Sequence, residues 1–194
     1  MKTTIPAAFA ALASLVVATP TPAAPLVARA CTTIAPTIID VLDSSTPNTA
    51  RPGEDLSLAR SASANTRVSA FTFNNIPAGA TGCMLEIDIP VLTENNEIAE
   101  GSSQADIWTT SPWDSSSLPT WNNQPTLQAM VSTFIFPTGQ TSSPFHTVLA
   151  SNSCSSTMSF LARLSTWQTT EGHVDFQNSI GGSQPIGWSL VFNC

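Results

Sequence analysis

The chain has 194 residues, of which 42% are apolar and only 10% are charged, and its formal net charge is −7. The low charged content argues against long exposed helices, whose surfaces normally carry Lys, Glu and Arg. With six Lys and Arg residues against thirteen Asp and Glu, the chain also lacks the basic patch that binding to nucleic-acid phosphates requires, so we expect no nucleic-acid partner.

The N-terminal segment is typical of a secretory signal peptide. Lys2 precedes the apolar run Ala7–Ala18, and Ala23 ends a short stretch of small residues that suits cleavage. The apolar run is too short for a membrane-spanning helix, which needs about 20 residues. We therefore predict that residues 1–23 are a signal peptide, that 24–30 are a short pro-segment or a flexible N-terminus, and that the protein is secreted without a transmembrane segment.

The remaining residues, 31–194, have the pattern of one all-β domain. Apolar and polar side chains alternate along short segments separated by Pro, Gly, Asn and Ser, and this period of two predicts strands. These segments are Ile34–Leu42, Leu56–Leu58, Ser69–Phe73, Met84–Ile89, Thr133–Phe136, Met158–Leu164, His173–Phe176 and Trp188–Phe192. Helix is nearly absent, because prolines interrupt the best remaining candidate, Leu118–Met130. We predict an antiparallel β-sandwich or jelly roll of about eight or nine strands.

Four cysteines, Cys31, Cys83, Cys154 and Cys194, lie in the predicted mature part of the chain. An even number of cysteines in an exported chain predicts two disulfides. Their wide spacing differs from that of zinc-binding cysteines, so we expect no metal site there. The sequence leaves all three possible pairings open.

Four stretches of sequence carry a resemblance to a known family. They are Ala70–Ile87, Ile107–Asp114, Phe160–Leu164 and Gly187–Cys194. They resemble secreted fungal proteins of the But-two C-terminal domain family, which is named for a yeast protein that binds the ubiquitin-like-activating enzyme. The resemblance runs from about Cys31 to the end and implies an extracellular β-sandwich. Its motifs are strand and turn features, so it carries over no active-site residues, and an exported chain would not normally meet a cytosolic ubiquitin-like pathway.

The segment Asp106–Pro125 holds the densest chemistry of the chain, with three tryptophans on what we interpret as a strand end and a long loop. Exposed indole faces can stack on sugar rings while Asn and Asp side chains bind the hydroxyl groups. The alternative is that the tryptophans pack the loop, as this residue is buried on average. The candidate ligand-binding residues are Trp108, Trp113, Asp114, Trp121, Asn122 and Asn123.

We predict no catalytic residues, no metal and no cofactor. His146 and His173 have no partner identifiable from spacing, and the nucleophile-elbow motif G-x-S-x-G is absent. Glu86 and Asp88 lie two residues apart on one strand face, a spacing that glycoside hydrolysis allows but that a solvated face explains better. Four acidic residues near loops could supply oxygens to calcium, but no ligand spacing connects them. They are Asp106, Asp114, Glu171 and Asp175.

These observations favour a secreted, non-catalytic extracellular module that associates with a cell wall or polysaccharide through its tryptophan loop. The first alternative is an effector-like or structural protein that binds another protein through an exposed sheet edge or apolar patch. The second is an unrecognised hydrolase, which would need a pocket that brings His146 or His173 to a carboxylate.

Overall fold

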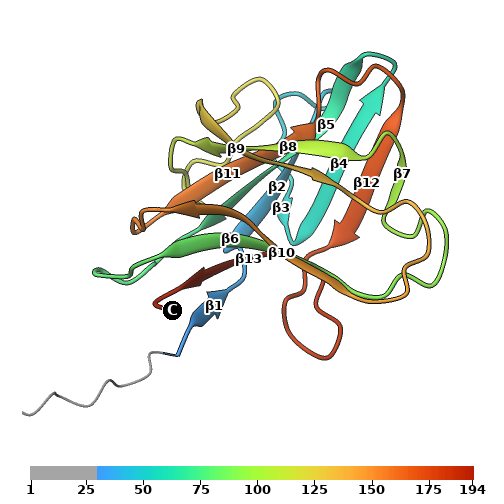
Figure 1. Ribbon diagram of the computed structural model, residues 1–194. Helices are drawn as coiled ribbons and strands as arrows, with labels where there is room; N and C mark the ends of the chain where they lie inside the picture. The colour runs from blue at the N-terminus through green and yellow to red at the C-terminus, as the bar shows by residue number, and fades with distance from the viewer. Residues whose placement is uncertain (1–29) are drawn as a thin grey trace, which may run out of the picture.

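The computed structural model describes residues 30–194, which form two antiparallel sheets and contain no helix (Figure 1). The predicted signal peptide, residues 1–23, and residues 24–29 of the segment after it lie outside the described residues. No helix that could cross a membrane occurs in residues 30–194. The prediction of an all-β, sandwich-like fold is confirmed.

Residues 30–194 contain thirteen strands. The smaller sheet consists of β1 (Thr32–Ile34), β13 (Gly187–Phe192), β6 (Cys83–Ile89) and β10 (Phe145–Asn152), in that spatial order. The larger sheet consists, in spatial order, of β7 (Ala99–Gly101), β12 (Gly172–Gln177), β4 (Asp55–Ser61), β5 (Ala64–Phe73), β11 (Met158–Leu164), β8 (Gln104–Thr110) and β9 (Leu127–Ile135). Beside this row, β2 (Ile38–Asp43) pairs with β5, and β3 (Pro52–Gly53) pairs with β2.

The larger sheet is organised around β5, the longest strand. Its first residues, up to Arg67, pair with β4, and Ser69–Phe73 pair with β11. Strand β2 pairs with Arg67–Thr72. Strands β4 and β11 thus pair with successive halves of β5. Beyond β4 the sheet continues with β12 and β7, and beyond β11 it continues with β8 and β9; we call these two groups the wings of the sheet. The sheet is curled as a result (Figure 1).

A buried arginine ties together the loops between the two wings. The guanidinium of Arg60, a residue only 3% exposed, donates hydrogen bonds to the carbonyls of Ser165, Thr170 and Ser102 at 2.7, 2.8 and 3.2 Å. It also donates to the side-chain oxygen of Gln168 at 3.4 Å. Backbone carbonyls therefore satisfy a charge that would be costly to bury without partners.

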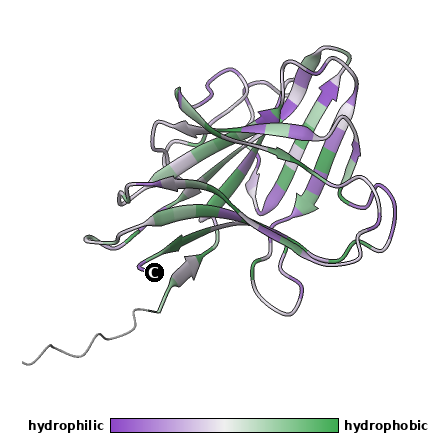
Figure 2. Ribbon diagram, in the orientation of Figure 1, coloured by the Kyte–Doolittle hydropathy of each residue, from purple (hydrophilic) through white to green (hydrophobic). Residues whose placement is uncertain are grey.

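The main core lies between the two sheets and follows from the alternation of side chains. On β6, Leu85 and Ile87 point into it and are fully buried, while the intervening residues face outward. Trp188 of the smaller sheet stacks on Phe71 of the larger sheet, with 5.1 Å between ring centroids, and Phe71 stacks on Phe160 at 5.4 Å. Figure 2 shows hydrophobic and hydrophilic residues alternating along the strands.

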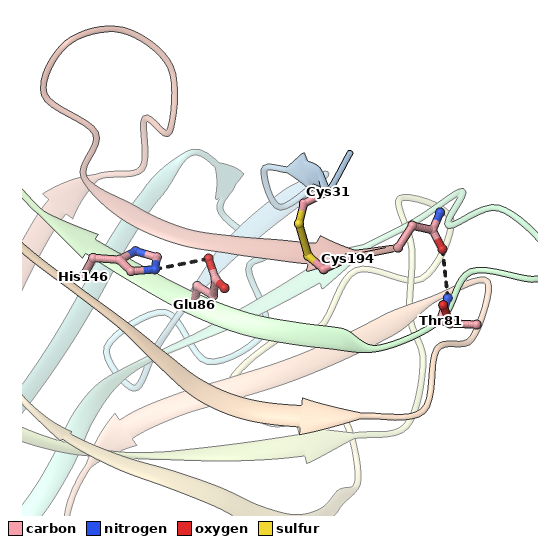
Figure 3. The surroundings of a disulfide bond; sticks show 6 residues. Cys31, Thr81, Glu86, His146 and Cys194 are labelled. Atoms are coloured by element: carbon pink, nitrogen blue, oxygen red, sulfur yellow. Dashed lines mark hydrogen bonds and ion pairs between the residues drawn. A yellow bond between two sulfur atoms is a disulfide. The ribbon is translucent and has the colours of Figure 1, made fainter. Parts of the chain in front are cut away.

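Both predicted disulfides are present, and the structure fixes their pairing. Cys31 is bonded to Cys194, which joins the chain just before β1 to the chain just after β13 (Figure 3). Cys83 at the start of β6 is bonded to Cys154, which follows β10. Neither bridge could be chosen from spacing alone.

The strand count differs from the eight or nine strands that the sequence predicts. The predicted strand Ile34–Leu42 is two strands, since Pro36 separates β1 from β2 and the two join different sheets. Strands β3 and β7 are too short to show alternation. Strand β8 was not among the predicted strands, and Trp108 lies within it rather than at its end. Strand β10 was missed because an edge strand with a register shift after Val148 has no clean alternation.

Candidate functional site

The tryptophan loop connects β8 to β9 and packs on the outer face of the larger sheet. Trp113 is only 7% exposed and forms a second apolar cluster with side chains from β2, β5 and β11. The other buried members of this cluster are Leu42, Val68, Ala70 and Leu161. The backbone carbonyl of Trp113 also accepts a hydrogen bond from the Thr72 hydroxyl at 3.1 Å. Trp113 therefore anchors the loop and presents no open indole face.

The polar candidates of this loop bind to the protein itself. The Asp114 carboxylate accepts hydrogen bonds from the Ser116 hydroxyl and backbone N–H, and these bonds hold the Asp114 pKa below its ordinary value. The side chain of Asn122 donates to Asn48 at 2.9 Å. The backbone of Asn123 forms a turn with Thr120. These residues build the loop, although all three candidates remain exposed.

The other two tryptophans are half-buried and differ in surroundings. Trp121 packs against the Trp113 cluster. Trp108 lies on β8 under the guanidinium of Arg163, whose central carbon is 5.1 Å from the ring centroid. The structure thus brings Trp113 and Trp121 together, with Trp108 outside their cluster. Sugar binding by these residues stays a prediction, and Trp121 is the more exposed member of the pair.

The outer face of the smaller sheet carries a histidine between two carboxylates. The register of β10 on β6 places His146 directly opposite Asp88, two residues from Glu86 on the same face. His146 Nδ1 lies 2.9 Å from Asp88 Oδ1, and Nε2 lies 3.6 Å from Glu86 Oε2. Figure 3 shows the His146 ring turned toward Glu86. Residues 58 positions apart are therefore joined by strand pairing.

The geometry of this cluster is that of an ion-pair group. Burial raises the pKa of the Glu86 carboxyl, and the nearby His146 lowers it in part. A histidine that acts as a general base needs one ring nitrogen free to take a proton from a nucleophile, while the other is held by a carboxylate. Both ring nitrogens of His146 face carboxylates. The arrangement positions charge but supplies no catalytic triad.

A hollow of about 350 Å³ opens beside this cluster, and we call it the Phe145 hollow. Its walls come from the end of β6, the start of β10 and the loop before β13, namely residues 88–91, 144–146 and 183–185. Val91 is 38% exposed and Phe145 is 45% exposed there. Asp88 is the one carboxylate among its lining residues, His146 lies next to it, and no Lys or Arg lines the hollow. The hollow is therefore an apolar surface with an acidic border.

The second histidine belongs to another surface group. His173 Nε2 lies 3.3 Å from Asp175 Oδ2, and the same carboxylate lies 3.9 Å from Arg67. Sequence spacing did not identify a carboxylate partner for either histidine, although His173 and Asp175 are neighbours on one face of β12. Among residues 30–194, no group of three or more His, Cys, Asp or Glu side chains could hold a metal ion.

The sequence missed the Phe145 hollow because its parts are distant along the chain. The available signal was the group of prolines at the ends of apolar strands, Pro90, Pro144 and Pro185, which mark where strands stop at one end of a sheet. Only the pairing of β10 and β13 with β6 shows that these ends meet. No single segment of the sequence contains all three walls of the hollow.

Comparison with known proteins identifies the family of the chain. No curated protein matches this sequence significantly. A family model described as the Ubiquitin 3 binding protein But2 C-terminal domain matches residues 35–179, which include β2 to β12 and therefore the whole larger sheet and strands β6 and β10 of the smaller one. The resemblance noted in the sequence is confirmed, and the chain belongs to the But2 C-terminal domain family.

Proposed function

We propose that this chain is a secreted, non-catalytic module that binds another protein at the Phe145 hollow. Secretion is supported by the signal-like residues 1–23 and by two disulfides, which are rare in cytosolic proteins. The family description, which names a binding protein, supports a protein partner.

The observation that carries the proposal is the exposed apolar wall of the hollow next to an acidic border. Exposed apolar patches beside polar groups are typical of protein-binding surfaces. Asp88 keeps 23% of its side chain exposed at the edge of the hollow, and the chain as a whole is acidic. The complementary partner presents an apolar side chain next to a Lys or Arg.

The absence of catalysis is part of the proposal. Both ring nitrogens of His146 face carboxylates. Among the described residues, no hydroxyl or thiol forms a hydrogen bond with either nitrogen. Ser189, which pairs with Glu86 across the sheet, is 1% exposed, so a substrate could not reach it. The hollow is thus suited to binding.

Cell-wall association through the tryptophan loop is the second candidate. The observation in its favour is that Trp121 is only half-buried and is followed by the exposed residues Asn122 and Asn123. One accessible indole with two amides could stack on a single sugar ring. We rank it below protein binding because Trp113 is buried.

The test separates the two candidates on the purified chain. A random peptide library is selected on the immobilised wild type, and the selected peptides are measured against Asp88→Lys and Val91→Lys. We expect peptides with Lys or Arg beside an apolar residue, and binding at least about tenfold weaker in both variants, which corresponds to about 1.4 kcal/mol. The matched control is Trp167→Lys, since Trp167 is 66% exposed and outside the hollow.

A parallel arm measures retention on insoluble chitin, β-glucan and cellulose. Retention that Trp121→Ala abolishes and Val91→Lys leaves unchanged would move the function to carbohydrate binding. Selected peptides without a basic residue, or binding that is insensitive to Asp88→Lys, would contradict the proposed partner.

A further inference from the structure

A second hollow, of about 330 Å³, lies at the end of the sandwich where β10 stops, and we call it the Asn152 groove. Its walls come from the end of β8, the start of β9, the chain that follows β10 and the start of β11. Since β10 belongs to the smaller sheet and the other three strands to the larger one, the groove spans the two sheets. It shares no lining residue with the Phe145 hollow.

Polar side chains occupy core-facing positions at this end of the sandwich. Residues directly opposite one another in paired strands direct their side chains to the same face of the sheet. Asn152 lies opposite Cys83, which belongs to the main core. Thr109 lies opposite Phe160, another core residue. Core-facing positions are normally apolar, so an amide and a hydroxyl at two of them mark a place where the core gives way to a polar site.

The amide of Asn152 is buried without a partner. Its Nδ2 atom has no contact with solvent and donates no hydrogen bond within residues 30–194. A buried N–H group without an acceptor is costly, and nearly all such groups in proteins are paired. The last side-chain torsion of asparagine is broad, so a rotation of the amide can bring this N–H to the groove that the residue lines. An acceptor in the groove would then satisfy it.

The lining favours a ligand that is uncharged and rich in hydroxyl groups. Eight of its eleven residues carry a hydroxyl or an amide, and none is Asp, Glu, Lys, Arg or His. Hydroxyls and amides both donate and accept hydrogen bonds, as the hydroxyl groups of a sugar do. A charged ligand would lose its hydration there without gaining a counter-charge. Pro112 and Met158 add apolar surface for the C–H groups of a sugar ring.

A peptide, the other neutral occupant, fits the groove less well. Extended peptides are bound mainly by a free strand edge. Strands β8 and β11, which supply much of the wall, are paired on both sides. Their backbone groups are therefore already used, and side chains are left to make the contacts.

The size and rigidity of the groove suit a short saccharide. Ligand sites measure about 300 to 1000 Å³, so a hollow of about 330 Å³ accepts about one or two sugar rings. Cys154 lies between the lining residues Ser153 and Ser155 and is bonded to Cys83 of β6. This disulfide holds one wall in place, and a preformed site loses less freedom on binding.

We propose that the Asn152 groove binds a neutral saccharide, with the Asn152 amide donating a hydrogen bond to a sugar oxygen. The site differs from the tryptophan loop, because none of the six candidate residues of that loop lines the groove. It is also independent of protein binding at the Phe145 hollow.

Isothermal titration calorimetry of the purified chain tests the proposal with four soluble probes, namely the tetrasaccharides of cellulose, β-1,3-glucan, chitin and β-mannan. We expect at least one probe to bind with a Kd of about 1 mM or tighter. Asn152→Leu removes the amide at similar volume and is expected to weaken binding at least about tenfold. Its Tm should not fall, since the buried N–H has no partner to lose. The matched control, Asn122→Leu, makes the same change on the tryptophan loop and is expected to leave binding unchanged.

Nuclear magnetic resonance locates the site without any substitution. The side-chain amide signals of Asn152 are expected to shift when the probe is added, and those of Asn122 are not. Failure of all four probes to bind would overturn the proposal, and so would binding that Asn152→Leu leaves unchanged. Binding lost in Asn122→Leu and kept in Asn152→Leu would place the sugar on the tryptophan loop instead. If Asn152→Leu does not fold, the Asn152 signals decide together with Gln128→Leu, an exposed lining position where we expect binding at least about threefold weaker.

Discussion

Replacing Trp113 with alanine is expected to destabilise the protein strongly, because this side chain anchors the loop between β8 and β9. Trp113 is 7% exposed and packs on residues of three strands. A buried tryptophan removes about 150 to 250 Å² from water, and its replacement by alanine costs about 3 to 5 kcal/mol. The total stability of a domain is about 5 to 15 kcal/mol, so this change removes a large share.

Two further substitutions separate packing from other causes. The indole Nε1 of Trp113 is buried without a hydrogen-bond partner, so Trp113→Phe loses volume but no hydrogen bond, and we expect a cost of about 1 to 2 kcal/mol. Trp121 is half-buried at the margin of the same cluster. Trp121→Ala is therefore expected to cost about 2 kcal/mol, roughly half the effect of Trp113→Ala.

Thermal unfolding followed by circular dichroism measures these differences. A loss of about 4 kcal/mol corresponds to a fall in Tm of about 8 to 16 °C for a chain of this size. Urea unfolding gives the same ordering in free energy. If Trp113→Ala melts within about 2 °C of the wild type and yet loses retention on a polysaccharide, Trp113 is a ligand contact and our interpretation of the loop is wrong.

Three other substitutions test the buried polar groups and the cross-link. Burial raises the pKa of Asp40 above its ordinary value of 3.8, so the folded state holds this proton more tightly than the unfolded chain does. The wild type should therefore lose stability relative to Asp40→Asn as the pH rises upward from about 3.8, and a pH-independent difference in Tm would contradict this. Arg60→Lys is expected to cost about 2 to 4 kcal/mol in urea unfolding, because one ammonium group cannot reach the acceptors that the guanidinium fork now binds, and a cost near zero would contradict that role. Replacing Cys83 and Cys154 with alanine removes a bridge that closes a loop with a sequence separation of 71. We expect this change to lower the free energy of unfolding by about 4 kcal/mol through loop entropy. An unchanged free energy of unfolding of the wild type under reducing conditions would show that the bridge adds no stability.

The fold was predictable from sequence where apolar and polar side chains alternate along a strand. The alternation around Leu85 predicted β6 to within one residue, and the alternation around Phe71 predicted the second half of β5, where Phe71 and Phe73 face the main core. The first half of β5 was missed. Strand β10 lies at a sheet edge, and its side chains are exposed or half-buried throughout, so no alternation arises. The alternation of apolar and polar residues therefore cannot identify such a strand.

The candidate sites were predictable only as residue types. The sequence identifies Trp113 as important but cannot distinguish an exposed stacking face from a buried anchor, since both place an aromatic residue in a polar loop. The pair of His146 and Asp88 depends on the register between β6 and β10, which the sequence does not specify. One residue of slippage would turn His146 to the other face of the sheet.

Site-specific photo-crosslinking tests most directly whether the Phe145 hollow binds a protein. A photoreactive phenylalanine derivative replaces Val91 or, as a control, Trp167, and the chain is irradiated with the culture fluid and the cell surface of the organism that produces it. We predict a discrete protein adduct from position 91 and none from position 167. Mass spectrometry should map the adduct to a segment with Lys or Arg beside an apolar residue, and Asp88→Lys should abolish it. Equal labelling from both positions, or an adduct that persists in Asp88→Lys, would contradict binding at the hollow.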